Sequence, residues 1–269
     1  MTRQEVITAM EESERNGIFD SHVDPIPEEL ILPVTEDYHY PNRRTVPERV
    51  KYGLEKFFIV RPYTWYQNRC VMHTKVLGRE NLRGLHAAVL TCNHVAKFDC
   101  LAVKYGARGH RVYTVAAPFN NMKGFLGEMM RAGDMLPLNT TLRGTRVFNQ
   151  TVEDVLTRKK AFLLIYPEAS MWWHYQKVRP FKDGAFSIAA KYHVPVVPQF
   201  ITFSERDSCD AEGIPEVSFT LHILPPIYPK AELEKKENTD YLKNAAFDAC
   251  RTVYEKVYGV PLTYTCEKK

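Results

Sequence analysis

The sequence contains no uninterrupted run of about 18 apolar residues, the length that a membrane-spanning helix needs. Residues 1–17 are charged throughout and lack the apolar core of a signal peptide. We therefore expect a cytoplasmic protein that contacts a membrane only peripherally, at the cytoplasmic face.

Patterns typical of several classes of active site are also missing. The six cysteines form no CxxC pair, and the nine histidines form no HxH or HExxH cluster. No Gly-x-Ser-x-Gly sequence occurs, which argues against a serine hydrolase. We expect reduced thiols, no bound metal and no cofactor.

The excess of positive charge is small. A formal net charge of +4 is too weak to indicate a nucleic-acid-binding protein, so we expect no nucleic-acid partner. The same excess suits a surface that meets anionic lipid or a phosphorylated ligand. With 45% hydrophobic and 25% charged residues, the composition is that of a globular protein.

Residues 1–72 predict an N-terminal helical and extended arm. Thr2 and Glu5 have capping-box spacing, and a proline-rich stretch follows that is either an arm wrapped on the protein or a poorly ordered leader. A second helix is expected to begin at Pro47, in PERVKYGLEKFFIV, and Pro62 is expected to kink or divide it. Aromatic rings beside lysine and arginine fit a helix at a membrane interface, or a core-packing helix whose cations reach water.

From residue 73 on, short apolar runs alternate with helical stretches. The runs are KVLG, AAVLTC, RVYTVAA, DMLPL, AFLLIY, VPVVPQFI and EVSFTLHIL. The expected helices cover residues 96–105, 122–132, 145–159, 184–192 and 240–258. This alternation predicts an α/β domain over residues 73–269, with a mostly parallel central sheet flanked by helices. The polar stretches 204–215 and 225–240 are expected to be surface loops.

One apolar run breaks at two polar residues, in AVLTCNHVAKFDCLAV. AVLTC has the composition of a buried strand, and Asn93 is suited to cap a helix that begins near Val95. His94 would then lie at a strand end, where open α/β sheets place their ligands. Across the turn, Asp99 can accept from one imidazole nitrogen and leave the other free to take a proton. Taken alone, the pair can equally be a locally satisfied histidine and an acid near a helix N-terminus.

A second carboxylate follows another strand-like run. AFLLIYPEAS places Glu168 at a strand end, and RPFKDGAF adds a basic-glycine turn before a helix of small residues. Parallel strands end at the same edge of a sheet, so we expect His94, Asp99 and Glu168 to converge there.

In their order along the chain, these segments resemble the glycerolipid acyltransferases, typified by 1-acyl-glycerol-3-phosphate acyltransferase. NHVAKFD resembles the family's first block, Asn-His-x4-Asp, and GDMLPLN, YPEAS and VPVVPQFI resemble its second, third and fourth. FKDGAF resembles the Lys-x-Gly-Ala turn found between the third and fourth blocks. The resemblance covers residues 75–201.

The resemblance implies transfer of a fatty acyl group from acyl-CoA or acyl-carrier protein to a hydroxyl of a lysophospholipid, in phospholipid synthesis. The expected acceptor is 1-acyl-glycerol-3-phosphate. By analogy, His94 is the general base and Asp99 orients it, and no covalent acyl-enzyme forms. Backbone N–H groups after Asn93 are expected to bind an oxyanion or phosphate. The implied acceptor-binding residues are Asn93, Arg143, Glu168, Ser170 and Lys182.

Two arginines that the family usually carries for the acceptor phosphate are absent. Asn139 and Thr140 stand near the end of the second block, and Met171 follows the third. Lys182 matches the expected lysine. The neighbouring cations that could substitute for the arginines are Arg143, Arg146, Lys177 and Arg179.

Two other functions remain open on the same scaffold. One is a hydrolase of lipid esters or thioesters, and the other is a non-catalytic lipid-binding protein, which the missing arginines suggest. The presence of His94, Asp99 and Glu168 favours an enzyme. The segment MWWHY after Ser170 either lines an acyl channel or packs as a loop on the sheet.

Overall fold

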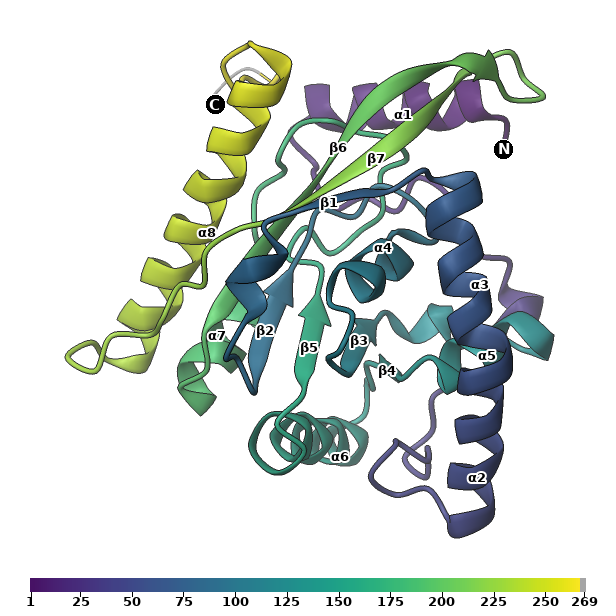
Figure 1. The fold of residues 1–269 in the computed structure, drawn as a ribbon, viewed down its shortest axis with the longest axis vertical. Helices are drawn as coiled ribbons and strands as arrows, with labels where there is room; N and C mark the ends of the chain where they lie inside the picture. The colour runs from purple at the N-terminus through teal and green to yellow at the C-terminus, as the bar shows by residue number, and fades with distance from the viewer. Residues whose placement is uncertain (267–269) are drawn as a thin grey trace.

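The computed structural model describes residues 1–266 as an α/β fold around a seven-stranded sheet (Figure 1). The strands are β1 (Lys75–Leu77), β2 (Ala88–Thr91), β3 (Val112–Ala116), β4 (Met135–Pro137), β5 (Phe162–Ile165), β6 (Val196–Cys209) and β7 (Pro215–Ile223). Their order is β1-β7-β6-β2-β5-β3-β4, and only the β6–β7 pair is antiparallel. Each predicted apolar run contains one strand, and the mostly parallel sheet is confirmed.

Helices cover both faces of this sheet (Figure 1). The α-helices are α1 (Arg3–Arg15), α2 (Val46–Glu55), α3 (Arg61–Tyr66), α4 (Asp99–Gly106), α5 (Gly124–Ala132), α6 (Leu142–Glu153), α7 (Gly184–Tyr192) and α8 (Lys235–Tyr258). The shorter helical turns are η1 (Glu28–Leu30), η2 (Lys56–Val60), η3 (Gln67–Val71), η4 (Arg79–Leu82), η5 (Pro118–Asn120) and η6 (Asp154–Arg158). Neighbouring residues of β2 point to opposite cores, because side chains alternate along a strand. Val89 packs with residues of α6, α7 and α8, and Leu90 packs with residues of α4.

Residues 46–71 form one helical segment in which α-helical and π-helical turns alternate. Pro62 lies in the first turn of α3, directly after the π-helical turn η2, where the N–H of Arg61 bonds to the carbonyl of Lys56. Pro62 has no N–H to donate, and the wider turn accommodates the missing bond. The chain therefore stays helical on both sides of Pro62, and the expected division of the segment is not found. No helix within residues 1–266 combines the length and the apolar character needed to cross a membrane.

The β6–β7 hairpin is longer than the sequence suggested. Residues 204–215 were expected to be a loop, but β6 continues to Cys209 and β7 begins at Pro215. The outer part of β6 is largely exposed, so its polar composition reflects a solvent-facing ribbon rather than a loop. In Figure 1 this ribbon extends beyond the rest of the sheet and lies beside α1.

The start of the chain packs against the loop that follows β5. Val6 and Met10 of α1 contact Val23 and Trp172, and Trp172 is fully buried. The indole Nε1 of Trp172 also donates to the carbonyl of Ser21, at 3.0 Å. The MWWHY segment is therefore a loop packed against the N-terminal arm.

Glu14 joins three distant parts of the chain. Its Oε1 accepts from the Lys177 ammonium at 2.7 Å and from the Thr265 backbone N–H at 2.8 Å. Glu14 is buried, and Lys177 lies in the loop after β5. Residues near both ends of the described chain thus meet beside this loop.

Candidate functional site

His94 and Asp99 lie at the carboxyl end of β2 and form the predicted pair. The Nδ1 atom of His94 is 2.8 Å from Oδ2 of Asp99. A carboxylate can only accept, so Nδ1 carries the proton, and in the neutral ring Nε2 is the acceptor. Within residues 1–266, Nε2 has no hydrogen-bond partner, and the His94 side chain is 22% exposed. The imidazole is thus oriented by one nitrogen and available through the other.

Asp99 is fully buried and held by several donors. Its Oδ2 atom also accepts from the backbone N–H groups of Val95 and Ala96, at 2.7 and 3.0 Å. Its Oδ1 atom accepts from the hydroxyl of Tyr166 at 2.6 Å, and the Tyr166 ring stacks on the His94 ring with centroids 4.0 Å apart. Burial and the charge of Asp99 raise the pKa of Tyr166, which therefore stays a neutral donor. Tyr166 was not among the predicted site residues, and its only signal in the sequence is its place at the end of the AFLLIY run.

Asn93 does not cap a helix, because α4 begins only at Asp99. The Asn93 side chain instead pairs with the backbone of Ile201, donating to its oxygen at 3.0 Å and accepting from its N–H at 2.7 Å. This pairing ties the end of β2 to β6. The N–H groups of residues 94–96 donate to the carboxylates of Glu168 and Asp99. They are therefore not available to an oxyanion or phosphate, and that expectation was wrong.

Glu168 and Arg179 form a buried ion pair behind His94. The Oε2 atom of Glu168 accepts from Nη2 of Arg179 at 2.7 Å and from the backbone N–H of His94 at 3.1 Å. Its Oε1 atom accepts from the backbone N–H of Arg179 at 3.0 Å, and both side chains are 1% exposed. Arg179 also donates to Oγ of Ser170 at 2.8 Å. In this arrangement Glu168 holds the backbone of His94 directly, whereas Ser170 helps to hold Arg179, and the roles of Glu168 and Ser170 in acceptor binding stay predictions.

The remaining candidate cations lie at the surface. The Lys182 ammonium is 2.7 Å from Oδ2 of Asp20, and its side chain is 60% exposed. Its backbone N–H donates to the carbonyl of Pro167, which places Lys182 beside the end of β5. Arg143 on α6 is more exposed and is 3.4 Å from Glu36 in the N-terminal arm. The structure thus gathers Lys182 with the edge that carries His94, whereas the contact of Arg143 is with the arm.

Asn139 stands near the place of an expected arginine, and its side chain forms hydrogen bonds with the protein backbone. Its amide nitrogen donates to the carbonyls of Val34 and Thr35, at 3.3 and 2.9 Å, and its oxygen accepts from the N–H of Thr141 at 3.0 Å. A Cβ atom on Gly144 would lie 2.0 Å from this side chain, so only glycine allows the close approach. Asn139 therefore fastens the N-terminal arm to the start of α6.

His174 lies in the loop after the third block, and we expect it to make the free energy of unfolding depend on pH. Burial and the positive charge of Arg3 lower its pKa to about 4, against a weaker opposing effect of Asp210. Between pH 6.5 and 4, the unfolded chain takes up a proton that the folded state refuses, so acidification lowers the free energy of unfolding. From pH 7 to pH 5 this loss should be about 2 kcal/mol.

His174→Asn should remove this part of the acid sensitivity, because asparagine tolerates the left-handed backbone (φ 52°) and cannot be protonated in this range. The measurement is urea unfolding at pH 7 and pH 5. His193→Asn is the matched control, since His193 is also left-handed (φ 50°) but exposed. Equal acid sensitivity in His174→Asn and the unmodified protein would contradict the assignment.

The site offers proton transfer at an oriented imidazole. Within residues 1–266, no group of three or more histidine, cysteine or acidic side chains could hold a metal ion. A neutral histidine held by a carboxylate is suited to remove a proton from a hydroxyl. The reacting hydroxyl then needs an electrophile with a good leaving group, such as a thioester.

Comparisons with known proteins agree with this chemistry. A family model described as Acyltransferase matches residues 73–202. The fold is similar to the crystal structure of the 1-acyl-sn-glycerophosphate (LPA) acyltransferase PlsC from Thermotoga maritima, with a TM-score of 0.52 and 19% sequence identity over 78% of this chain and 80% of that one. No curated protein sequence matches the chain. The resemblance to the acyltransferases that the ordered blocks predicted is confirmed for residues 73–202.

Proposed function

We propose that this protein transfers a fatty acyl group from acyl-CoA or acyl-carrier protein to the hydroxyl of a lysophospholipid, with 1-acyl-glycerol-3-phosphate as the acceptor. The observation that carries the proposal is the 2.8 Å contact between His94 and Asp99, which leaves Nε2 as a proton acceptor. The family model and the fold of the similar acyltransferase support the same reaction.

The chemistry follows from the state of the imidazole. Nε2 of His94 removes the proton of the acceptor hydroxyl while the hydroxyl oxygen attacks the thioester carbonyl carbon. The carbon–sulfur bond then breaks, and the imidazolium returns the proton to the departing thiolate. Asp99 stabilises the transient positive charge on the ring and keeps Nδ1 protonated. Because the thioester has a good leaving group, no covalent acyl-enzyme is required.

Lys182 is our candidate for the acceptor phosphate. It lies beside the end of β5, and its ion-pair partner Asp20 is itself 47% exposed. Exposed ion pairs contribute little free energy, so a phosphate dianion can compete with Asp20 for this ammonium. The proposal therefore does not need the two arginines that the sequence lacks.

An acceptor screen tests the reaction. The protein is incubated with one acyl-CoA and a panel of lysophospholipids and simple alcohols, and the products are identified by mass spectrometry. We expect a diacyl phospholipid that forms only with the matching acceptor, together with one free thiol for each acyl group transferred. Equal release of fatty acid with and without an acceptor would identify a hydrolase, and binding without turnover would identify a lipid-binding protein.

We also propose that the helical segment 46–71 docks peripherally on a membrane. Its exposed apolar side chains recur every three or four residues, as on an amphipathic helix. They are Val46, Val50, Leu54, Phe57 and Phe58, with Phe125 of the neighbouring α5 also exposed. Lysine and arginine on the same segment suit an anionic surface.

Phe57→Ser/Phe58→Ser should weaken binding to lipid vesicles at least about tenfold, because fully burying one such side chain is worth ~1.5–3 kcal/mol. The two rings are 57% and 66% exposed, so the substitution removes little packing within the protein. Co-sedimentation with vesicles of phosphatidylcholine and phosphatidylglycerol measures the effect. Tyr228→Ser/Val260→Ser is the control, because both residues are exposed but lie outside the segment. Unchanged co-sedimentation of Phe57→Ser/Phe58→Ser would refute the docking surface.

A further inference from the structure

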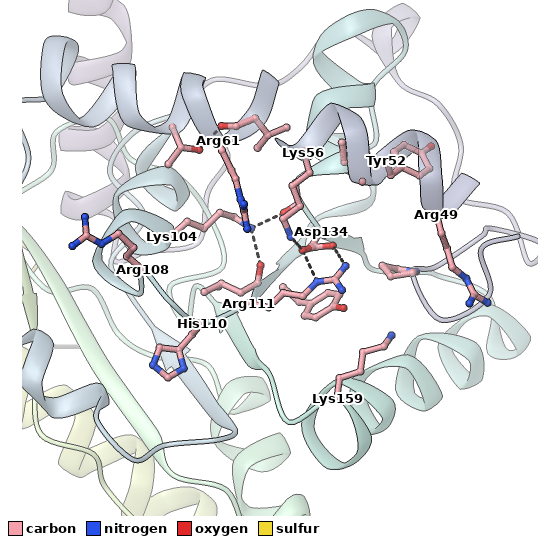
Figure 2. Close-up of a pocket in the computed structure, with 18 of the residues that line it drawn as sticks. Arg49, Tyr52, Lys56, Arg61, Lys104, Arg108, His110, Arg111, Asp134 and Lys159 are labelled. Carbon is pink, nitrogen blue, oxygen red and sulfur yellow. Dashed lines mark hydrogen bonds and ion pairs between the residues drawn. The ribbon is translucent and has the colours of Figure 1, made fainter. Parts of the chain in front are cut away.

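A basic cavity lies at the edge of the sheet opposite His94 (Figure 2). Arg111 and Asp134 directly precede β3 and β4, whereas His94 and Glu168 follow β2 and β5. Because these strands are parallel, the first two residues lie at the amino ends and the second two at the carboxyl ends. The cavity has a volume of about 1140 Å³ and is walled by α2, η2 and α3 on one side. It is separate from the site proposed for acyl transfer.

Positive charge in this cavity greatly exceeds negative charge. Eight lysine and arginine side chains line it, against the carboxylates of Asp134 and Asp154. Both carboxylates are already paired, Asp154 with Lys159 at 2.7 Å and Asp134 with Lys56 and Arg111. The remaining cations therefore have no carboxylate of their own in the lining.

Asp134 is the anchor of the cation cluster. It is 1% exposed and accepts two bonds from Arg111, at 3.0 and 2.7 Å. Burial opposes its ionisation, but the Arg111 hydrogen bonds and the charges of Lys56, Arg111 and Lys104 outweigh burial and lower the pKa of Asp134 to about 2. One carboxylate thus holds two of the cations that line the cavity, Lys56 and Arg111, and Figure 2 shows both beside Asp134.

Two of the cations, the half-buried Lys104 and the buried Arg44, are bound only to uncharged acceptors. The Lys104 ammonium donates to the carbonyls of Val112 and Gly133, and burial lowers its pKa to about 8. Arg44 is 5% exposed and donates to the carbonyl of Arg131, but its Nε atom is buried without a hydrogen-bond partner. Burying charges in this way is costly unless an anion compensates them. An unpartnered guanidinium N–H beside the cavity is what a bound anion would satisfy.

Arg61 and Arg108 also line the cavity. Arg61 lies on α3, and Arg108 lies in the turn after α4. Within residues 1–266, neither guanidinium takes part in a hydrogen bond or an ion pair with another side chain. Both side chains are exposed, so they are free to rearrange around a ligand.

We propose that this cavity binds a phosphorylated, multiply anionic group through Arg44, Arg61, Lys104 and Arg108. Guanidinium groups match the geometry of phosphate oxygens, and a cavity of this volume can hold a ligand well beyond a single ion. The phosphate can belong to a soluble ligand or to a lipid headgroup, because Arg61 lies on the same helical segment as Phe57 and Phe58, with its guanidinium carbon 5.7 Å from the centroid of the Phe57 ring. The proposal does not depend on the acyltransferase reaction.

Binding measurements on the full chain test the proposal. In one arm, inorganic pyrophosphate is titrated into the protein by calorimetry. In the other, co-sedimentation is compared for phosphatidylcholine vesicles with and without phosphatidic acid, in the presence and absence of pyrophosphate. Saturable binding of pyrophosphate alone identifies a soluble ligand. A preference for phosphatidic acid that pyrophosphate abolishes identifies a headgroup.

Arg61→Gln/Arg108→Gln should weaken whichever binding is found at least about tenfold, because each arginine supplies charge-assisted hydrogen bonds. The matched control is Arg15→Gln/Arg251→Gln, which removes the same charge from exposed positions outside the cavity. His94→Ala should bind as the unmodified protein does, which separates this site from the reaction. Circular dichroism shows whether the double variant is folded. If it is not, the single variant Arg108→Gln is used for the same binding measurements. No binding in either arm, or unchanged affinity in the cavity variant, would overturn the proposal.

Discussion

Replacing His94 by glutamine should lower the rate of acyl transfer by about 10²- to 10⁴-fold, the usual contribution of a general base. Glutamine can still donate a hydrogen bond toward Asp99, but it cannot take a proton from the acceptor hydroxyl. The measurement is the release of thiol from acyl-CoA in the presence of the acceptor that the screen identifies. The large effect follows because His94 is the group that the Asp99 carboxylate orients, at 2.8 Å.

His193→Gln is the control for this substitution, since His193 is exposed at the end of α7. It should leave the rate unchanged. A rate for His94→Gln within about twofold of the unmodified enzyme would rule out His94 as the base.

Arg179→Met should lower the free energy of unfolding by about 3–5 kcal/mol, the cost of leaving one member of a buried ion pair without its partner. Glu168 would then remain in a site where it is 1% exposed. Ser170 would lose the guanidinium donor as well, at 2.8 Å in the native structure. Urea unfolding monitored by tryptophan fluorescence gives the free energy, and the midpoint should shift to lower urea.

Arg143→Met is the matched control, because Arg143 also pairs with a glutamate but is 72% exposed. Such surface pairs contribute at most about 1 kcal/mol. The double variant Arg179→Met/Glu168→Gln should be more stable than Arg179→Met alone, because it no longer buries an unpaired carboxylate. If Arg179→Met were as stable as Arg143→Met, the ion pair would not be the brace that we describe.

Much of the fold could be predicted from local pattern. The apolar runs located the strands because a buried strand is a short, continuous apolar segment. Residues 184–192 were predicted as a helix with the bounds that α7 has. The main difference is the hairpin, since the composition of an exposed ribbon is hard to distinguish from that of a polar loop. Asn93 was misassigned because its partner Ile201 lies 108 residues away.

In the candidate site, too, the contacts between residues close in sequence could be predicted, whereas the long-range contacts could not. The pairing of His94 with Asp99 could be predicted, because five residues across a strand-to-helix turn leave few ways to fold. The partner of Glu168 could not be predicted. Arg179 looked like one of several surface cations, and only the packing of the loop after β5 against the N-terminal arm buries it. Local sequence therefore located the pair of His94 and Asp99, whereas long-range packing decided which residues support it.

The bridge from Glu14 to Thr265 also bears on synthesis by the ribosome. It spans 251 positions, and Glu14 simultaneously holds Lys177 in the loop that carries Arg179. A nascent chain can pair β2, β3, β4 and β5 early, but a contact of this span closes only after residue 265 has emerged. The support behind His94 is therefore complete only once Thr265 is available to fold against Glu14. A chain that ends before Thr265 would contain His94 and Asp99 but would lack one contact that holds the loop carrying Arg179.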